Sequence, residues 1–470
     1  MIIPHGQHDQ MVGKLFVICV LVALFVSGRI TPATALVIPP LADPPSGSTL
    51  TSLSVTFTGT HTSDDLEHKL RIGTTNGGAQ IYNKTMPPNH SVTVSGLPSM
   101  GTIYVWYWTR NSSGWFVNTS TYTMNVGRIW NCAAGDTACL INAITLANAS
   151  GNPEVIQLAA GTYILPTLSS TNPGPLLPMI RGNIAIEGAG PQPTILRSNN
   201  RPQDTGISDF VTFDVDEGAI LKLTGLSMME VGTSIYNRGV VTLQKVTISD
   251  NQGVGAGIVN LKTGTVKMEH STLTNISQGV LGSGTPIQND GKMDIVESAI
   301  KSNRTGLVGA IFNSSTGVMT VQTTTIADNQ VNESGAAGIK NFGNMELTKS
   351  LIQNNIGQGA PGIENRGEMQ ISKSVITGNE STEAGWDGGG IYNVGTLAIS
   401  RTVIANNTVT STGRGGGIYN QAHLSLDRTI IAGNQAGTDG GGIMNELNAL
   451  LTLTETTVAN NAPNDCAGCP

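Results

Sequence analysis

The sequence predicts an all-β protein: a long stack of similar strand coils, closed at its start by a short helix and preceded by a small β-sandwich. An Ile-x-Asn element recurs from Ile235/Asn237 to Ile443/Asn445 at intervals of 23 to 29 residues. The chain has 470 residues with 58 Gly and only 12% charged residues, a composition unsuited to helices. Short alternating apolar segments, separated by turn signals, fill residues 36–126.

The N-terminus has the pattern of a secretory signal. Lys14 precedes an apolar run at 15–26, and Ala-Thr-Ala at 33–35 is a small-residue cleavage pattern. Residues 1–35 are therefore predicted to be a signal peptide, with an uncleaved anchor as the alternative. The run is shorter than the ~20 residues that cross a bilayer. We expect a secreted or cell-surface chain without an integral membrane span in its mature form.

Residues 36–126 read as a β-sandwich. In the segment TIYVWYWTR, Trp106 and Trp108 lie on one face of a strand and Tyr107 on the other, and we interpret Trp106 as a core residue. Trp115 follows a turn and is the exposed ring that could contact a sugar. This segment and the following GWFVNTSTYTMNV resemble the fibronectin-type or immunoglobulin-like modules of exported bacterial surface proteins.

The repeats predict coils that stack directly on one another. Each coil follows a track of apolar residues that bends after two short strands, as at Leu397, Ile399, Thr402, Ile404 and Asn407. Neighbouring strands lie about 4.8 Å apart, so equivalent residues of successive coils form ladders. Stacked asparagine amides can hydrogen-bond from coil to coil, which explains their recurrence without a ligand. The predicted structural ladder contains Asn341, Asn365, Asn393, Asn420 and Asn445.

These coils resemble parallel β-helices of the pectin-lyase-like class. The strings GGGIYN at 388–393 and 415–420, and GGGIMN at 440–445, are similar to the repeats of polymorphic outer-membrane proteins. The resemblance implies a single-stranded, right-handed parallel β-helix over residues 155–470. The glycines allow a tight corner and require no phosphate.

Residues 127–154 are predicted to cap the first coil. The segment CLINAITLANAS has apolar residues at helical spacing and follows Asp136-Thr137, which can cap a short helix. Cys132 and Cys139 with this helix resemble the CSLREA domain of exported β-helix proteins, although CLINAI lacks the usual Arg-Glu pair.

Four cysteines remain after the predicted signal. In an exported chain they suggest disulfides within the pairs Cys132–Cys139 and Cys466–Cys469. For the second pair the alternative is two inert cysteines without a bond between them. A four-thiolate zinc site would need both pairs at one point, which a stack of coils between them forbids. A redox role for the second pair lacks the usual βα context.

Charge and motif patterns give no catalytic signature. The net charge is −7 and follows no pattern, which argues against nucleic acid as a partner. Polysaccharide cleavage in this fold would need an acidic ladder, or carboxylates with a base, on one flank. The positions after the apolar track are asparagines instead. Glu269 and His270 are adjacent and point to opposite faces, while Asp250 and Asp328 occupy corners that favour a turn role over a metal role. We predict no catalytic residue, metal or cofactor.

One loop cluster interrupts the repeat. Glu383, Trp386 and Asp387 precede the 388–393 corner, and Arg414 and Asp439 lie in the equivalent loops of the next two coils. With Trp115 they are the candidate ligand contacts, against the alternative that they are ordinary solvated loop residues.

The sequence favours a noncatalytic, monomeric surface protein that uses a rigid scaffold for adhesion or for binding a polysaccharide, cell-surface glycan or protein. The alternative is a polysaccharide lyase or glycoside hydrolase of the pectin-lyase-like class. The identity of the ligand and the mode of attachment to the cell surface are not encoded in a recognisable motif.

Overall fold

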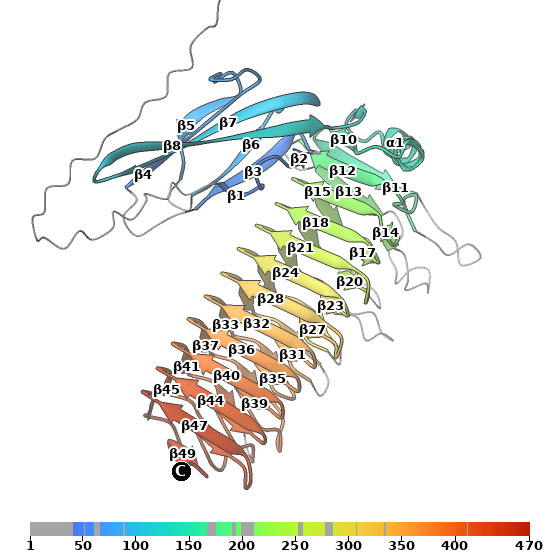
Figure 1. Ribbon diagram of the computed structural model, residues 1–470. Helices are drawn as coiled ribbons and strands as arrows, with labels where there is room; N and C mark the ends of the chain where they lie inside the picture. The colour runs from blue at the N-terminus through green and yellow to red at the C-terminus, as the bar shows by residue number, and fades with distance from the viewer. Residues whose placement is uncertain are drawn as a thin grey trace, which may run out of the picture.

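The computed structural model describes residues 41–50, 52–60, 66–87, 90–166, 175–189, 194–198, 211–251, 257–277, 285–306, 308–332, 335–410 and 412–470. The predicted signal peptide, residues 1–35, lies outside these ranges. Within them the chain forms a long parallel β-solenoid with two smaller sheets beside its first coils (Figure 1). No helix in the described ranges is long and apolar enough to cross a membrane.

The two smaller sheets enclose a core of their own. Phe57, Leu70, Tyr107 and Tyr122 are buried between them. The strands of the three-stranded sheet are, in order, β1 (Leu41–Asp43), β3 (Ser54–Gly59) and β6 (Ser91–Ser95). The strands of the five-stranded sheet are β2 (Thr49–Leu50), β8 (Gly114–Asn125), β7 (Met100–Asn111), β4 (Glu67–Gly73) and β5 (Tyr82–Thr85). We call this unit the N-terminal module.

The interpretation of Trp106 as a core residue was wrong. Along β7 the buried side chains are Ile103, Val105 and Tyr107, whereas Trp106 and Trp108 are half-exposed on the opposite face. Alternation along a strand separates two faces but does not say which one is inside. Here both faces carry large side chains, and the set that includes Tyr107 faces the core.

The solenoid is built from parallel sheets that run its whole length. The 13-stranded sheet contains β9 (Ile129–Cys132), β10 (Glu154–Leu158), β12 (Asn183–Gly188), β15 (Ile220–Thr224), β18 (Val240–Gln244), β21 (Thr265–Glu269), β24 (Lys292–Val296), β28 (Val318–Gln322), β32 (Asn344–Thr348), β36 (Glu368–Ser372), β40 (Thr396–Ser400), β44 (His423–Asp427) and β47 (Leu450–Thr454). The 12-stranded sheet contains β11 (Gly161–Leu165), β13 (Thr194–Ser198), β16 (Ser227–Met229), β19 (Thr247–Ser249), β22 (Thr272–Thr274), β25 (Ala299–Lys301), β29 (Thr325–Ala327), β33 (Leu351–Gln353), β37 (Val375–Thr377), β41 (Val403–Ala405), β45 (Ile430–Ala432) and β48 (Thr457–Ala459).

Two further sheets complete the coils. The 11-stranded sheet contains β14 (Val211–Val215), β17 (Thr233–Asn237), β20 (Ile258–Asn260), β23 (Ile287–Asn289), β27 (Ile311–Asn313), β31 (Ile339–Asn341), β35 (Ile363–Asn365), β39 (Ile391–Asn393), β43 (Ile418–Asn420), β46 (Ile443–Asn445) and β49 (Cys466–Ala467). A short fourth sheet contains β26 (Arg304–Thr305), β30 (Gln330–Val331), β34 (Ile356–Gly357), β38 (Glu380–Ser381) and β42 (Thr408–Val409). The all-β, parallel β-helix prediction is confirmed.

The coil at 391–409 shows how the sequence makes the turn. Ile391, Leu397, Ile399 and Ile404 point inward and are at most 2% exposed. Each such side chain contributes roughly 1.5 to 3 kcal/mol by leaving water. Between β40 and β41 the chain bends at Arg401, whose φ of 48° lies in the left-handed region. Equivalent polar residues at the same bend of other coils also have positive φ.

Buried asparagines connect the coils along two columns. In the first, each side-chain amide donates to the amide oxygen one coil further on at 2.7 to 2.9 Å, from Asn237 through Asn393 to Asn445. In the second, the same contact measures 2.8 or 2.9 Å from Asn303 through Asn407 to Asn461. The asparagines of both columns also donate to backbone carbonyls of neighbouring coils, as Asn393 does to His423 and Asn407 to Ile376.

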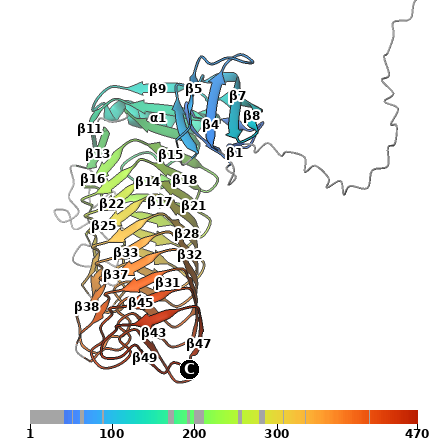
Figure 2. The same ribbon diagram turned by 90° about the vertical axis from the view of Figure 1, so that its left-hand side faces the viewer.

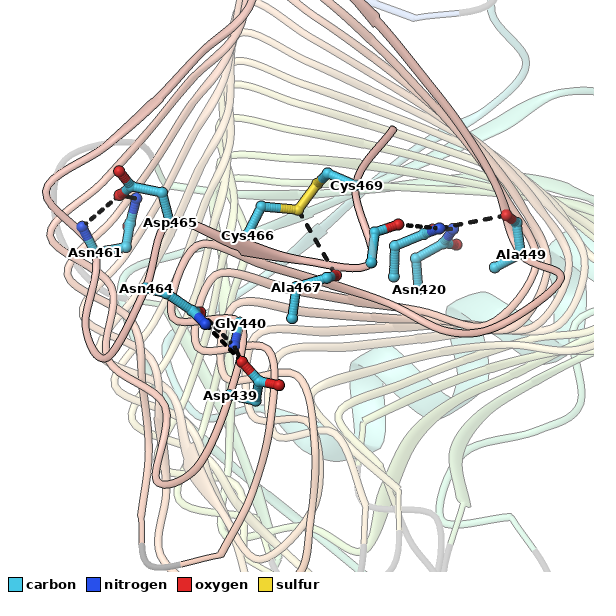
Figure 3. The surroundings of a disulfide bond; sticks show 12 residues. Asn420, Asp439, Gly440, Ala449, Asn461, Asn464, Asp465, Cys466, Ala467 and Cys469 are labelled. Carbon is cyan, nitrogen blue, oxygen red and sulfur yellow. Dashed lines mark hydrogen bonds between the residues drawn. A yellow bond between two sulfur atoms is a disulfide. The ribbon is translucent and has the colours of Figure 1, made fainter.

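The two ends of the stack have different covers. At the start, α1 (Thr137–Ser150) lies across the first coil and buries Leu140, Ile144 and Ala147 against it (Figure 2). The Asp136 carboxylate caps this helix by accepting from the Cys139 backbone amide at 2.9 Å. Cys132 and Cys139 form a disulfide. At the far end, Cys466 and Cys469 form the second disulfide, beside the last rungs of the asparagine columns (Figure 3).

The N-terminal module packs against the outer face of the 13-stranded sheet. Val155 and Ala185 of that sheet join the core of the module. Lys222 donates from Nζ to Ser52 Oγ at 3.3 Å and to the Ser54 carbonyl at 3.1 Å. These apolar and polar contacts fix the module to the first coils.

Candidate functional site

The outer face of the 11-stranded sheet carries a row of side chains in register. In each Ile-x-Asn triplet the isoleucine and the asparagine point inward, so the middle residue lies on the outer side of the sheet. Strand pairing aligns these middle residues from coil to coil. Along the C-terminal half of the solenoid the row reads Phe312, Lys340, Glu364, Tyr392, Tyr419 and Met444.

A second row comes from the residue that follows each asparagine. Its members contact the first row and one another: the Phe342 ring centroid lies 5.7 Å from that of Phe312, and the Arg366 guanidinium lies 6.0 Å from the Tyr392 ring centroid and 5.8 Å from that of Phe342. Glu364 forms ion pairs with Lys340, at 3.2 Å, and with Arg366. Together the two rows form a surface of rings and charges, in which Tyr419 is only 1% exposed and Glu364 only 6% because neighbouring side chains cover them.

Tyr392 and Tyr419 stack at the centre of this surface. Their ring centroids are 5.3 Å apart with an interplanar angle of 9°. Tyr392 donates its hydroxyl to Gln421 Oε1 at 3.2 Å, and Gln421 Nε2 donates to the Tyr419 hydroxyl at 3.0 Å. The glutamine therefore connects the two tyrosines and fixes their spacing.

Arg414 connects the surface to the loop that precedes it. Its Nη2 donates to Asp387 Oδ2 at 3.0 Å and to the Tyr419 hydroxyl at 2.9 Å, and its Nη1 donates to Glu446 Oε1 at 2.7 Å. The Arg414 backbone amide also donates to Asp387 Oδ1, at 2.7 Å. Tyr419 donates in turn to Glu446 Oε1 at 2.5 Å. We call the surface formed by Phe312, Lys340, Phe342, Glu364, Arg366, Trp386, Asp387, Tyr392, Arg414, Tyr419, Gln421 and Glu446 the aromatic strip.

The network shifts the protonation of its members. Burial raises the pKa of Tyr419, and the hydrogen bond to Glu446 raises it further. The hydrogen bond from Tyr419 lowers the pKa of Glu446, and Arg414 lowers it too. The tyrosine therefore remains protonated and the glutamate ionised near neutral pH, so the strip presents fixed donors and acceptors.

The structure brings together some of the residues that the sequence singled out. Asp387 and Arg414 pair directly, and Trp386, immediately before Asp387, is 41% exposed. Glu383 is an exposed residue of the same loop. Asp439 does not join Arg414; its Oδ1 accepts from Asn464 Nδ2 at 2.6 Å, near the C-terminal disulfide (Figure 3). Trp115 lies on the N-terminal module.

Sequence reasoning missed the tyrosines and their partners. Tyr392, Tyr419, Gln421 and Glu446 lie inside the repeat, and the Ile-x-Asn pattern assigns them no role. The signal that could have found them is the variable middle residue: it points outward and stacks at the same interval as the ladder.

Other acidic residues of interest are held in structural contacts. Asp250 and Asp328 have φ values of 57° and 56°, so they occupy turns. His270 pairs with Glu297 at 2.6 Å, one coil further on, and not with Glu269. Among the described residues no group of three His, Cys, Asp or Glu is placed to hold a metal ion.

A cleft lies between the N-terminal module and the solenoid. Its volume is about 550 Å³, and Thr93, Ser95, Glu187 and Lys245 are among its lining residues. Glu187 accepts a hydrogen bond from Ser52 Oγ at 3.1 Å. Beside the cleft, burial lowers the pKa of Lys222. Within the described residues, the cleft therefore has beside it a lysine with a shifted pKa, Lys222, and a carboxylate, Glu187, which is a combination typical of functional sites.

Comparisons with known proteins found likenesses in structure only. No protein-family model and no curated protein matches the chain. A Yersinia enterocolitica family 28 exopolygalacturonase is 9% identical with a TM-score of 0.30, covering 91% of this chain and 99% of its own. A mannuronic acid specific polysaccharide family 6 lyase from human gut microbiota is 11% identical with a TM-score of 0.33, covering 68% and 86%. The A-module of an Azotobacter vinelandii mannuronan C-5 epimerase is 12% identical with a TM-score of 0.31, covering 71% and 96%. Likenesses this distant carry no argument about the activity of the chain.

Proposed function

We propose that this protein is a noncatalytic, exported scaffold that binds a glycan along the aromatic strip. The observation that carries the proposal is the partly exposed Tyr392, which stacks on the buried Tyr419 and lies on the same strip as the exposed Trp386. Rings that present an apolar body and a polar tip are suited to surfaces that are half apolar and half hydroxyl, as sugars are.

The spacing of the coils supports a chain-like ligand. Equivalent side chains recur every ~4.8 Å along the stack. A polysaccharide extends by a comparable step per sugar, so an extended glycan parallel to the axis would meet a similar set of groups at each residue. The ionic residues Lys340, Glu364 and Arg366 continue the strip beyond the tyrosines, which lengthens the surface that such a chain could contact.

The chemistry of the strip favours binding over cleavage. A glycosidase needs one carboxyl with a raised pKa as the general acid and a second carboxylate across the bond. Glu446 has a lowered pKa, and both Glu446 and Asp387 are bonded to Arg414. The arrangement therefore supports anchoring of a ligand, because its carboxylates are already engaged.

The context of export belongs to the same proposal. Two disulfides suit an oxidising compartment. We propose a signal peptide at 1–35, an immunoglobulin or fibronectin-like module at 36–126, a CSLREA-like cap at 127–154 and a β-helix at 155–470 with repeats like those of polymorphic outer-membrane proteins. The mature chain would act as a monomer at the cell surface or outside the cell.

A glycan array probed with the whole protein tests this proposal, followed by titration of the best ligand against variants. We expect Tyr392→Ala to weaken binding by about tenfold, the equivalent of about 1.4 kcal/mol. Tyr236→Ala is the matched control, since Tyr236 occupies the same triplet position on β17, far from the tyrosine pair. Equal loss in both variants, or no glycan bound at all, would overturn the proposal.

The second candidate function is polysaccharide cleavage at the cleft between the modules. The cleft favours it, because Glu187 lines the cleft and burial lowers the pKa of the nearby Lys222, which makes this lysine a better proton acceptor for abstraction α to a carboxyl group. Assays for unsaturated uronates and for new reducing ends over a polysaccharide panel test it. Product formed by the native protein and abolished in Lys222→Met would support cleavage and contradict a noncatalytic role.

A further inference from the structure

The outer face of the five-stranded sheet in the N-terminal module carries large aromatic side chains together with cations. Strand pairing sets Lys69 opposite Trp108 and Arg71 opposite Trp106, and at the end of the hairpin Arg110 lies opposite Trp115. Trp115 is 47% exposed, and the solenoid packs elsewhere on the module. Indole rings left on a solvated face lose the burial that normally stabilises them, so this face calls for a functional explanation.

Four of these residues line a pocket. Lys69, Arg71, Trp108 and Trp115 surround a hollow of about 350 Å³. The Arg71 guanidinium lies 5.1 Å from the centroid of the Trp108 ring, within the range of a cation–π contact. The pocket thus combines two ring faces with two positive charges, and its described lining residues include no acidic side chain.

The cations of the pocket have no ion-pair partner in the part of the chain that the structure describes. Within the described residues neither Lys69 nor Arg71 makes an ion pair within 4 Å, and the buried Nε of Arg71 has no hydrogen-bond acceptor. Arg110, just outside the pocket, has Glu67 at 3.5 Å. Positive charges without an ion-pair partner attract an anionic ligand that enters the pocket. The unpaired charges are also notable in a chain whose net charge is −7.

We propose that this pocket binds an anionic polysaccharide whose sugars carry carboxylates. A pyranose ring would stack on the exposed Trp115 or Trp108, and its carboxylate would accept hydrogen bonds from Arg71 and Lys69. The lining residues explain both parts of this ligand. The indole rings favour the apolar face of a sugar ring, and the planar guanidinium of arginine favours a planar carboxylate. This site lies on a different module from the aromatic strip and does not depend on it.

Calorimetric titration of the whole protein with oligogalacturonate tests the proposal. A neutral galacto-oligosaccharide of equal length removes the carboxylates, and poly-glutamate keeps them without the rings. We expect binding of oligogalacturonate alone, with an affinity that falls as salt is added. Equal binding of poly-glutamate would reduce the pocket to a charged patch and overturn the assignment, and so would equal binding of the neutral sugar or no binding of any probe.

Variants localise the site. Arg71→Ala and Trp115→Ala should each weaken oligogalacturonate binding by about tenfold or more, as for loss of a charge-assisted or stacking contact. Trp106→Ala is the matched control, since it removes an indole from the same face of β7 outside the pocket. Loss of binding in Trp106→Ala equal to that in Trp115→Ala would contradict the assignment. Tyr392→Ala separates the two proposals: oligogalacturonate binding that depends on Tyr392 and not on Arg71 would place the ligand on the aromatic strip instead.

Discussion

Asparagine columns should contribute to stability according to their depth in the stack, and Asn393→Ala tests this. The Asn393 side chain is fully buried. Its Nδ2 donates to Asn420 Oδ1 at 2.8 Å, to the His423 carbonyl at 3.0 Å and to the Gly395 carbonyl at 3.1 Å. Its Oδ1 accepts from Asn365 Nδ2 at 2.9 Å. Removing the amide breaks all of these contacts at once.

The expected loss follows from these contacts. Each hydrogen bond contributes about 1 kcal/mol net to the free energy of unfolding. Removing the Asn393 amide also leaves buried polar atoms of the neighbouring rungs without a hydrogen-bond partner. Asn393→Ala should therefore lower the free energy of unfolding by about 3 to 4 kcal/mol. The matched control is Asn445→Ala on the last rung. Asn445 is 8% exposed, and its Nδ2 has only the carbonyls of Ala449 and Gly468 as acceptors. Water can replace those contacts, so we expect about 1 to 2 kcal/mol.

Urea denaturation followed by circular dichroism measures the loss, and amide hydrogen exchange locates it. Because a solenoid can open locally, exchange is needed to show that protection falls in the coils around residues 391–409. Equal losses at the two positions would refute the reasoning, since the contacts of the interior rung would then add nothing beyond those of an end rung. So would a loss below about 1 kcal/mol for Asn393→Ala.

Two further predictions follow from the strip and the cap. Because the pKa of Glu446 is lowered in the folded protein, its ionised form stabilises the strip above the ordinary value of 4.5, and that stability is lost as pH falls through the lowered value. Glu446→Gln should reduce the fall in melting temperature between pH 6 and 3 relative to the parent protein. A variant whose melting temperature falls as steeply as that of the parent would contradict this. The pair Cys132→Ser with Cys139→Ser opens a loop with a sequence separation of 7, which by chain entropy costs about 2 to 3 kcal/mol. Exchange protection should fall in α1 while the coil at 391–409 keeps its protection, and a uniform loss would disprove a local role for the cap.

The fold was predictable because its signal is repeated. One Ile-x-Asn corner is ambiguous, but the interval that returns from Ile235 to Ile443 allows only stacked coils. The bends were less visible. Arg401 has a positive φ, which an arginine in the sequence does not predict. The stacked neighbours on both sides determine the backbone conformation there.

The candidate site was predictable only in part. Asp387 and Arg414 stood out because they interrupt the repeat, whereas Tyr392 and Tyr419 were hidden by lying within it. In the N-terminal module, the pattern separated Trp106 from Tyr107 but could not decide which faces the core, since burial depends on the second sheet. The periodicity of a strand therefore predicts which residues share a face better than it predicts which of the two faces is exposed.

The contact between the N-terminal module and the first coils has a consequence for avidity. Lys222, Gln244 and Val155 tie the module to the 13-stranded sheet, so the pocket at Arg71 and the strip at Tyr392 are held on one body. A single polymer that reached both would gain its second attachment without the entropy loss of ordering a flexible linker. Such bivalent capture would select for chain length as well as for sugar type, so that short fragments of the same polysaccharide would be released.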